Sequence, residues 1–478
     1  MSLSPARNAA FEILMRVETT DAYASELLHS SRFERLSTAD HALVTELAMG
    51  VLRWRSVLDH KIAERCNQPP AKLDREVLTS LRLGAYQVLF LDRIPPHAAI
   101  NESVELVKRA HKKSAAGMVN AVLRRMAGLY SVKKDEPDFR VAHPNWLVER
   151  WAQTYGEEMA NKICRYDQAK PHAAVRITAA ADNRAGIATT NVGAGALTRP
   201  AAPRAASGDH SPRSRTKASG TTQALPHERS DLEGMRVEPG KLLSRAALVE
   251  SGDITRTRAF REGRLMIQDE ASQLVALLVR EGKNILDCCA APGGKTRILA
   301  QQNPNAKVIA MDLHPHRAKL IRKLVADLNV QVVAADARNM PFAAKFDRIL
   351  VDAPCSGTGT LARNPDIKWR LKPEDLARLQ GYQIEILTAA KKHVAPGGRI
   401  VYSTCSLEPE ENQQVVERAI AGDPCLRVLE CKDELRKLQQ SGELTYGDLD
   451  SLLTGHFLRT LPGVHPCDGF FAAVLQRE

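Results

Sequence analysis

The sequence has no pair of cysteines at the Cys-x-x-Cys spacing that is common in structural zinc sites. Its nine cysteines are scattered along the chain and odd in number. A disulfide-stapled protein would carry an even set at regular spacings. His314 and His316 have no other metal-ligand residue types clustered near them in the sequence. We therefore expect no disulfide framework, no metal site and a reducing environment.

Long apolar runs are also missing. No segment approaches the roughly 18 consecutive apolar residues that a membrane-spanning helix requires. The opening stretch, MSLSPARNAAFEILMRV, contains a glutamate and has no long apolar core, which is unlike a signal peptide. We expect a cytoplasmic protein that makes no membrane contact and acts as a monomer.

Basic residues outnumber acidic ones, with 67 lysines and arginines against 56 aspartates and glutamates and a formal net charge of +11. This balance favours an anionic partner, most simply nucleic acid, although a basic protein without such a partner would show the same numbers. At 478 residues the chain is too long for one ordinary core. We therefore expect several domains.

Residues 1–130 predict a bundle of helices. Apolar residues recur at three- and four-residue intervals, as in Leu43, Leu47 and Val51. The segment 92–97, DRIPPH, interrupts this pattern, because proline lacks the amide hydrogen that a helix interior requires. Interleaved basic residues would form either a phosphate-facing surface or an ordinary solvated one. They are Arg53, Arg55, Lys108, Arg109, Lys112, Lys113, Arg124 and Arg125.

Residues 131–262 predict further helices and a small α/β unit. Helical periodicity continues to about Tyr166, and residues 171–178 have the pattern of a strand. From about residue 181 to 233, small residues, proline and arginine dominate, and large apolar side chains are nearly missing. Such a segment cannot bury enough surface to offset the entropy of ordering. We predict a disordered insertion there and expect structure to return by Leu242.

Residues 263–478 alternate strand and helix patterns with short turns. Strands are predicted at 284–287, 307–312, 330–336, 346–352 and 399–403, with a hairpin strand within 462–477. Helices are predicted between them, among others at 318–327 and 375–393. This alternation predicts a doubly wound α/β domain whose mostly parallel sheet is covered on both faces.

The first of these strands runs into the loop 288–295, CCAAPGGK. Ligands of doubly wound sheets bind beyond the carboxyl ends of the strands, and glycines let the backbone approach a ligand closely. The loop has neither the GxGxxG nor the GxxxxGK[ST] spacing, which argues against a dinucleotide or a nucleoside triphosphate. It favours a nucleoside without phosphates, such as S-adenosylmethionine.

The first four predicted strands all end in an aspartate, namely Asp287, Asp312, Asp336 and Asp352. One such aspartate alone is more often a turn or helix cap, but four at corresponding positions point to a shared ligand site. Asp312, at the end of the second strand, stands where an acid accepts hydrogen bonds from ribose hydroxyls.

Two cysteines follow neighbouring strand ends. Cys355 lies in DAPCSGTG at 352–359, and Cys405 lies in STCS at 403–406. A lone cysteine is usually a small buried residue. Two at one rim, both among glycine, serine and threonine, are better explained as reactive thiols near a transferable methyl group.

Two sets of motifs resemble known families. PPHAAINESVELVK at 95–108 and VNAVLR at 119–124 resemble the NusB-type helical RNA-binding domain. AAPGGK at 290–295, DAPCSGTG, STCS and DGFF at 468–471 resemble RNA (cytosine-5) methyltransferases of the NOL1/NOP2/Sun family. The resemblance covers nearly the whole chain, except that the insertion at about 181–233 departs from the family pattern.

The resemblance implies the following division of the chain. Residues 1–130 would form an all-α NusB-like domain, 131–262 would hold linker helices and a small α/β (RRM-like) domain, and 263–478 would form a Rossmann-like class I methyltransferase domain with a mostly parallel sheet.

The resemblance also implies an activity, methylation of C5 of a cytosine in 16S rRNA with S-adenosylmethionine. Cys405 would be the nucleophile that adds to C6, Cys355 would assist release, and Asp352 would hold the base near N3. Since a free thiol titrates near about 8.5, Lys295 would help to activate Cys405. Asp336 would contact adenine. The implied cofactor-binding residues are Cys289, Ala290, Ala291, Pro292, Gly293, Gly294, Lys295, Asp312, Asp336 and Asp352.

Other functions stay open at this point. The substrate could be tRNA instead of rRNA. DNA cytosine methylation would use the Pro-Cys thiol of Cys355, but Cys405 and the NusB-like domain count against it. A non-catalytic RNA-binding or ribosome-assembly factor would need neither the two thiols nor the four acids.

Three further features have mainly structural readings. The segment 408–412, EPEEN, predicts the start of a helix, with an indirect role in positioning Cys405 as the second reading. Trp369 could stack on RNA, but packing is the preferred interpretation. Cys288 and Cys289 are interpreted as small residues that fit the loop.

Overall fold

The computed structural model describes residues 3–33, 35–128, 138–178 and 235–478, so the insertion predicted to be disordered at about 181–233 lies outside the described residues. The helices are α1 Pro5–Thr19, α2 Ala24–Leu28, α3 Thr38–Arg53, α4 Arg55–Ala63, α5 Arg75–Phe90, α6 Pro96–Arg109, α7 Ala116–Ala127, α8 Asn145–Tyr155, α9 Glu157–Gln168, α10 Arg258–Arg261, α11 Glu270–Leu278, α12 Gly294–Gln302, α13 Pro315–Leu324, α14 Ile367–Arg370, α15 Pro373–His393, α16 Gln413–Ile420 and α17 Cys431–Gln440. The strands are β1 Ala173–Ile177, β2 Arg236–Pro239, β3 Ala246–Ser251, β4 Leu265–Ile267, β5 Asn284–Asp287, β6 Lys307–Asp312, β7 Val330–Ala334, β8 Phe346–Asp352, β9 Val394–Thr404, β10 Leu426–Leu429, β11 Leu453–Thr454, β12 Phe457–Thr460 and β13 Phe470–Arg477. None of the described helices has the length and apolar character to cross a membrane.

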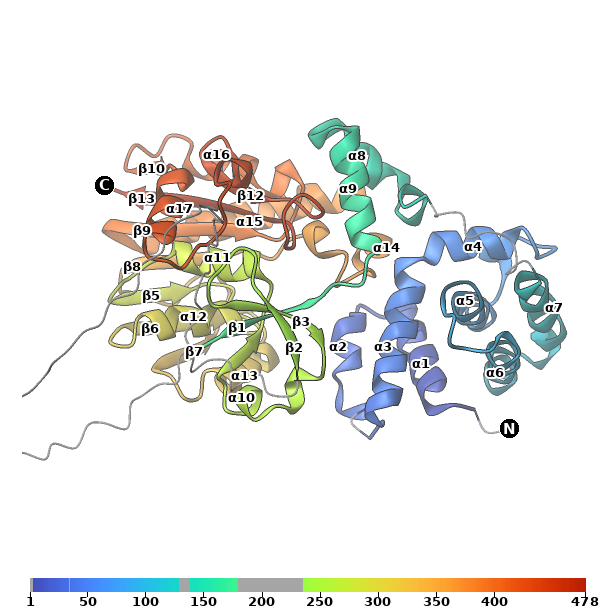
Figure 1. Ribbon diagram of the computed structural model, residues 1–478. Helices are drawn as coiled ribbons and strands as arrows, with labels where there is room; N and C mark the ends of the chain where they lie inside the picture. The colour runs from blue at the N-terminus through green and yellow to red at the C-terminus, as the bar shows by residue number, and fades with distance from the viewer. Residues whose placement is uncertain (1–2, 34, 129–137, 179–234) are drawn as a thin grey trace, which may run out of the picture.

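The first seven helices form the predicted bundle, with α5 at its centre (Figure 1). The helix α5 is buried around almost its whole circumference, because apolar and small residues occupy nearly every position from Val77 to Val88. Its Gly84 lies against α7, where a Cβ atom would come within 2.4 Å of a methyl carbon of Leu123. The predicted apolar series is confirmed, with Leu47 and Val51 fully buried in the same core.

The bundle is joined to the C-terminal sheet by α8, α9 and the short helix α14 (Figure 1). The Lys368 side chain is 1% exposed, and its Nζ donates to the carbonyl of Arg53 at 3.0 Å. Trp369 Nε1 donates to the carbonyl of Leu52 at 2.6 Å. These bonds satisfy carbonyls of the last turn of α3, which have no partner within the helix. The junction is therefore held by specific hydrogen bonds as well as by apolar contacts. Trp369 packs inside the protein at this junction.

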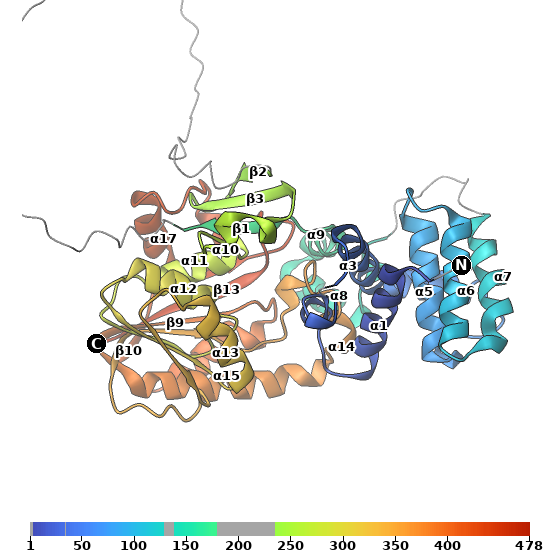
Figure 2. The same ribbon diagram turned by 90° about the horizontal axis from the view of Figure 1, so that it is seen from below.

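The expectation that all eight basic residues of the bundle lie on its surface, whether phosphate-facing or merely solvated, is wrong for Arg53. Arg53 is buried and donates to the carbonyl of Ala362 at 2.9 Å, so it holds the junction. Arg55 is half-buried and pairs with Glu18 at 3.3 Å. The basic residues of α6 and α7 are mostly exposed, on the side of the bundle that lies away from the large sheet (Figures 1 and 2). Only these keep the character of a solvated basic surface.

Four strands form a small antiparallel sheet in the order β2-β3-β1-β4. Structure has resumed before Leu242, as predicted, because β2 begins at Arg236. The strand β4 pairs with β1, although the predicted boundary at 262/263 would assign it to the C-terminal domain. The connection between β1 and β2 runs largely outside the described residues, so the RRM-like character of this unit stays a prediction.

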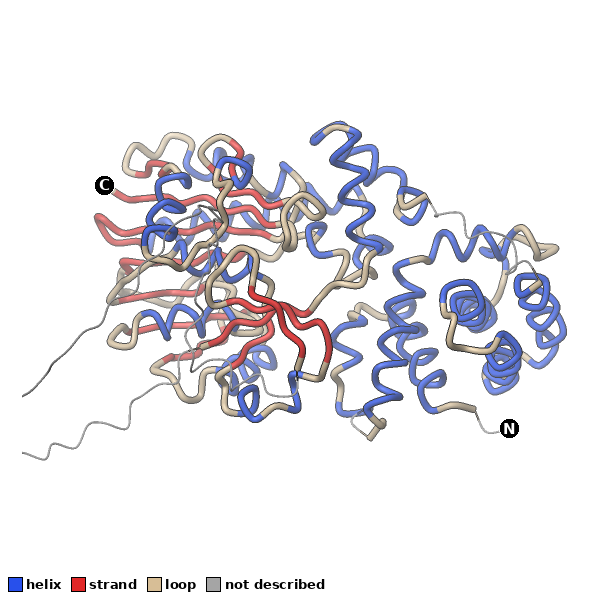
Figure 3. The backbone as a smooth tube through the Cα atoms, in the orientation of Figure 1, coloured by secondary structure: helices blue, strands red, loops and turns tan. Residues whose placement is uncertain are grey.

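The large sheet has nine strands, in the order β11-β12-β13-β9-β8-β5-β6-β7 with β10 beside β13. Strands β5 to β9 are parallel, and β13 is antiparallel to β9. The predicted mostly parallel, Rossmann-like sheet is confirmed, and the predicted bounds of β5, β6 and β8 are correct. Figure 3 shows the helical bundle and the strands of both sheets as separate regions of the molecule.

Both faces of the large sheet are covered, because side chains of its central strands alternate between two apolar cores. Ile285, Leu350 and Val401 face the core formed with α11, α12 and α17. Leu286 and Tyr402 face the opposite core, formed with α15 and α16. Figure 2 shows α15 along one side of the sheet, with α11 and α17 on the other. This burial on two faces explains the nearly continuous apolar runs of β5 and β8.

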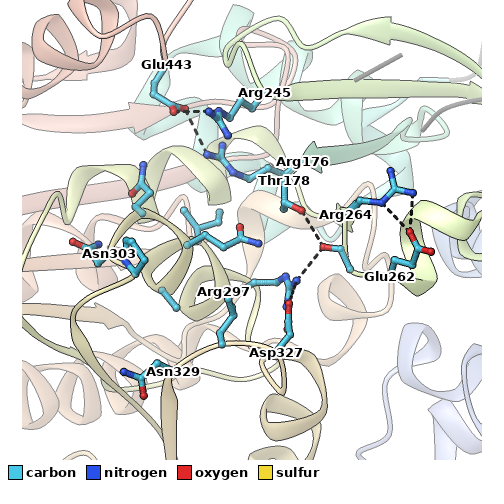
Figure 4. A pocket seen from close by; sticks show the side chains of 17 residues that line it. Arg176, Thr178, Arg245, Glu262, Arg264, Arg297, Asn303, Asp327, Asn329 and Glu443 are labelled. Carbon is cyan, nitrogen blue, oxygen red and sulfur yellow. Dashed lines mark hydrogen bonds and ion pairs between the residues drawn. The ribbon is translucent and has the colours of Figure 1, made fainter. Parts of the chain in front are cut away.

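A cavity of about 550 Å³ lies where the small sheet meets the large one (Figure 4). Its wall includes residues 303–304 and 327–329, which precede β6 and β7, so it lies at the edge of the sheet opposite the predicted site. Four arginines line it, and each is paired with a carboxylate inside the protein. The pairs are Arg176 and Arg245 with Glu443, Arg264 with Glu262, and Arg297 with Asp327. The cavity is thus a polar region between the two sheets, and the arginines that line it are paired with carboxylates of the protein.

We predict that Trp369→Ala lowers the free energy of unfolding by about 2–3 kcal/mol, because it removes apolar contacts and a hydrogen bond to α3. Urea unfolding followed by circular dichroism measures this loss. The exposed Arg378→Ala serves as the control and should change stability by less than about 0.5 kcal/mol. Equal stability of the two variants would contradict the assigned role of the junction.

Candidate active site

Three loops meet at the carboxyl edge of the large sheet. They follow β5, β8 and β9, which are neighbours and run parallel. The strand order reverses between β5 and β8, since β6 and β7 continue on one side and β8 and β9 on the other. Ligands of doubly wound sheets bind at such a reversal point. The fold therefore brings the predicted loops 288–295, 352–359 and 403–406 together.

The loop 288–295 is held against β6 by its backbone. Ala290 N donates to the carbonyl of Met311 at 2.8 Å, and Ala291 N donates to Oδ2 of Asp312 at 3.3 Å. The Ala291–Pro292 peptide bond is cis. Gly293 caps α12 with φ +114°, a backbone conformation that residues other than glycine rarely adopt. The loop ends at the amino terminus of α12, so backbone N–H groups point into the site.

The aspartates at the ends of β5 and β6 have different surroundings. Asp287 is fully buried and accepts a hydrogen bond from Thr296 Oγ1 at 2.7 Å. It thereby fixes the far end of the loop, at the start of α12, to the end of β5. Burial raises the pKa of Asp287 to about 7. Asp312 accepts hydrogen bonds from the backbone N–H groups of Ala291 and His314, which leaves further lone pairs for a ligand.

The predicted end of the third strand is wrong. The strand β7 stops at Ala334, two residues before Asp336. Both carboxylate oxygens of Asp336 accept hydrogen bonds from the Arg338 guanidinium, which lowers the pKa of this carboxyl. A ligand at Asp336 would compete with Arg338, and the adenine-binding role of Asp336 stays a prediction.

The two predicted thiols face each other. Cys355 Sγ and Cys405 Sγ are 3.4 Å apart, and both residues are half-buried. Their loops are aligned by the pairing of β8 with β9, in which Asp352 stands opposite Ser403. The hydrogen bond with Cys405, followed by burial, raises the pKa of the Cys355 thiol well above its usual value. Cys355 is therefore held as a neutral thiol in the free protein.

Asp352 accepts one hydrogen bond at each oxygen. Ser403 Oγ donates to Oδ1 at 2.8 Å, and Lys295 Nζ donates to Oδ2 at 2.7 Å. Burial lowers the pKa of Lys295, but the charge of Asp352 and its hydrogen bond, followed by the charge of Cys405, raise it overall. The ammonium also lies over the Phe470 ring, 5.2 Å from its centroid. The Lys295 ammonium thus lies beside Asp352, and its pKa also responds to the charge of Cys405.

The DGFF segment closes the site through contacts with Arg363 and Asp269, two residues that the sequence did not single out. Arg363 donates from Nε to Asp468 at 2.7 Å and from Nη2 to Asp269 at 3.1 Å. Burial raises the pKa of Asp468 to about 7. Asp468 was visible in its motif, but Arg363 and Asp269 belong to no motif. Only the folded chain brings these three residues together.

Two glycines carry the contact between the loop after β8 and the DGFF segment. Gly359 N donates to the carbonyl of Cys405 at 2.9 Å, and Gly469 N donates to the carbonyl of Gly359 at 2.8 Å. A Cβ atom at Gly359 would lie 2.1 Å from the carbonyl oxygen of Gly469. Three motifs are thereby joined backbone to backbone.

Another buried residue that the sequence under-weighted is Glu411. It lies in a 3₁₀ turn, Pro409–Glu411, that precedes α16, rather than in the first turn of an α-helix as predicted. Its carboxylate points inward and is fully buried among hydroxyl and amide groups. The repeated glutamates of the segment 408–411 make it stand out in the sequence, but the sequence does not indicate which of them turns inward.

Cys288 and Cys289 differ from the facing pair. Burial raises the pKa of both thiols well above the usual value, so neither is disposed to react. Cys289 packs at the edge of the apolar core below the sheet. The interpretation of these residues as small side chains that fit is consistent with this environment. No group of three or more metal-ligand side chains is found within the described parts of the chain.

The chain matches two protein families. Residues 274–476 match the model described as 16S rRNA methyltransferase RsmB/F, and residues 4–128 match the NusB family. A Bacillus subtilis protein named "Probable ribosomal RNA small subunit methyltransferase B" is 35% identical over 89% of this chain and 90% of its own length. "Ribosomal RNA small subunit methyltransferase B" of Vibrio cholerae is 31% identical over 99% of this chain and 97% of its own length.

Solved structures share the fold. The crystal structure of PH0851 superposes with a TM-score of 0.73 at 21% identity and covers all of both chains. The crystal structure of NSun6 from Pyrococcus horikoshii with SFG has a TM-score of 0.52 at 20% identity and covers 70% of this chain and 98% of its own. At these identities the likeness shows the architecture alone.

We predict that Gly359→Ala lowers the free energy of unfolding by about 1–3 kcal/mol, because the new methyl group would overlap the Gly469 backbone. Gly381→Ala is the matched control. Gly381 lies in α15 with open space around its Cα, so alanine should stabilise the protein by up to about 1 kcal/mol. Urea unfolding of both variants provides the comparison, and tolerance of Gly359→Ala would contradict the close contact.

We predict that Asp287 makes stability depend on pH. In the folded protein its carboxyl keeps its proton up to about pH 7, whereas in the unfolded chain it ionises near about pH 4. Within this window the free energy of unfolding falls as pH rises, by at most roughly 1 kcal/mol per pH unit. Asp287→Asn keeps the acceptor for Thr296 and should have a smaller slope, with the remaining slope due to groups such as Asp468 whose pKa is also raised, as measured by urea unfolding at pH 5, 6 and 7. The same slope in both proteins would refute the assignment.

Proposed function

Because the chain belongs to the RsmB/F family of 16S rRNA methyltransferases, we propose that it methylates C5 of a cytosine in 16S rRNA, using S-adenosylmethionine and a covalent bond between Cys405 and C6. One observation carries this proposal. Two thiols from neighbouring strand ends lie 3.4 Å apart beside a glycine-rich loop at the reversal point of the sheet. A methyltransferase acting on a more nucleophilic atom would not need this pair.

The loop after β5 fits S-adenosylmethionine. Gly293 lets the loop lie close against Ile321 and Leu324 of α13, and Asp312 has lone pairs left for ribose hydroxyls. The residues that would hold the cofactor are Cys289 to Lys295 and Asp312, with Asp336 and Asp352 at the two ends of the site. When bound there, S-adenosylmethionine supplies a methyl group to a carbon nucleophile.

Cys405 makes C5 of cytosine nucleophilic. Its thiolate forms a bond to C6, and the electron pair of the C5–C6 double bond moves towards C5 and the ring. The Asp352 carboxyl, held by Ser403 and Lys295, is placed to hydrogen-bond the base near N3 and to stabilise the charge that develops. Lys295, whose pKa is raised in part by the charge of Cys405, is the residue that we propose assists this attack.

Cys355 completes the reaction. Its pKa in the free protein is raised chiefly by Cys405. Once the Cys405 sulfur is bonded to C6, it carries no charge and offers no thiolate, so the pKa of Cys355 falls. Cys355 can then release its proton to water, and the resulting thiolate takes the proton from C5, whose C–H electrons restore the C5–C6 double bond. The C6–S bond breaks, and its electron pair returns to Cys405.

The target base has to leave its stack to reach the sheet edge, so we propose a single-stranded or flipped cytosine as substrate. The exposed basic side chains of α6 and α7 supply a second, distant surface for the RNA backbone. We propose that the bundle binds the RNA while the large sheet carries out the chemistry.

We predict that Cys405→Ala lowers methyl transfer at least about 1,000-fold, because no group can then add to C6. Cys355→Ala should accumulate a protein–RNA adduct that survives denaturation. The assay combines undermethylated small-subunit rRNA with labelled S-adenosylmethionine, followed by denaturing gel electrophoresis. The exposed, distant Cys425→Ala is the control and should behave as the unmodified protein. Normal turnover by Cys405→Ala would overturn the proposed mechanism.

A further inference from the structure

A single buried carboxylate links the two thiol loops. Glu411 is fully buried, and its Oε1 accepts from Ser356 N at 2.8 Å and from Gln383 Nε2 at 2.9 Å. Its Oε2 accepts short hydrogen bonds from the hydroxyls of Ser356 and Ser406. All the donors point at one group, and a carboxylate, which can only accept, satisfies every one of them.

The two serines are the residues that immediately follow the thiols. Ser356 follows Cys355 in the loop after β8, and Ser406 follows Cys405 in the loop after β9. Their hydroxyl oxygens are also 3.0 Å apart. Movement of Glu411 would therefore shift both thiols.

The carboxylate is anchored to a long helix. Gln383 belongs to the 21-residue helix α15, and its Nε2 also donates to the carbonyl of Pro354 at 2.9 Å. The Tyr402 hydroxyl donates to the carbonyl of Glu411 at 2.6 Å, which fixes the turn against β9. The two thiol loops are thus anchored to α15 and β9, and both of these elements contribute side chains to the same apolar core.

Stability alone does not account for this arrangement. Among the described residues no cation forms an ion pair with Glu411, whereas the equally buried Glu408 pairs with Arg150 at 2.9 Å. Burying a charge without a counter-ion is unfavourable unless hydrogen bonds replace its water. The bonds that do so here come from both thiol loops and bind each more strongly than neutral bonds would.

We propose that Glu411 is a positioning residue that sets the distance between the Cys355 and Cys405 thiols, and thereby lets one reaction use both. This inference rests on the proposed function. Formation of the C6 adduct needs Cys405 in place over the base, and its resolution needs Cys355 at the neighbouring C5. Loops that move independently would lose both steps, because a misplacement of about 1 Å can lower a rate about 100-fold.

The first test compares Glu411→Ala, Glu411→Gln and Glu408→Gln in the full chain. Glu411→Ala should lower kcat about 100-fold, with KM for RNA and for S-adenosylmethionine within about threefold of the original. Glu411→Gln keeps an acceptor for Ser356 N and Gln383, so it should recover about a tenth of the original kcat or more. Glu408→Gln alters a carboxylate whose hydrogen bonds go to Arg150 and Trp151 and not to Ser356 or Ser406, and it should leave kcat unchanged.

The second test reports the thiol spacing without catalysis. Phenylarsine oxide binds two nearby thiols as a cyclic dithioarsenite and releases water, so it requires both sulfurs within bonding reach of one arsenic atom. The original protein and Glu408→Gln should bind it at this pair, and Cys355→Ala should not. Glu411→Ala should bind it at least about tenfold more weakly, while Glu411→Gln lies between. If Glu411→Ala does not fold by circular dichroism, Glu411→Gln against Glu408→Gln decides both tests.

The two proposals fail in different ways. If Cys405→Ala retains activity, the proposed reaction is wrong, whatever the arsenical shows. If Cys405→Ala is inactive but both Glu411 variants keep the original kcat and arsenical affinity, only the positioning role is wrong. A loss confined to KM would also overturn it, because that result would place Glu411 in binding.

Discussion

The parallel pairing of β8 with β9 is the interaction on which the rest of the site depends. It sets Asp352 opposite Ser403, so the loops that follow start side by side and bring Cys355 within 3.4 Å of Cys405. A slip of one residue in this register would turn each side chain to the other face of the sheet. Such a slip would also exchange the side chains that pack into the two cores on either side of the sheet.

Polar groups buried between apolar layers give this framework its specificity. Lys368 and Arg53 tie the helical bundle to the segment between β8 and α15, and Arg363 ties the same segment to the DGFF motif. The segment 353–372 is therefore attached both to the reacting groups and to the bundle. Placement of the bundle and geometry of the site are consequences of one connected set of contacts.

Much of this could be predicted because it depends on local patterns. The bounds of β5, β6 and β8 follow from apolar runs between turn residues, and Cys355 and Cys405 follow from motifs at strand ends. Other features depend on contacts between distant segments. Arg53 looks like a surface cation until α14 is packed against it, and the segment 408–411 does not reveal that Glu411 alone reaches both thiol loops. Asp336 was misplaced because the edge strand β7 ends early.

The position of β13 in the sheet has a consequence for the order in which the protein is made. This strand follows every other strand of the described residues, yet it pairs with β9 up to Thr404, directly beside Cys405. The bundle has a core of its own and can fold while synthesis continues. The thiol loop after β9 cannot settle until Phe470–Arg477 has left the ribosome. Each nascent chain therefore gains its helical bundle before the loops at the carboxyl edge of the large sheet are complete.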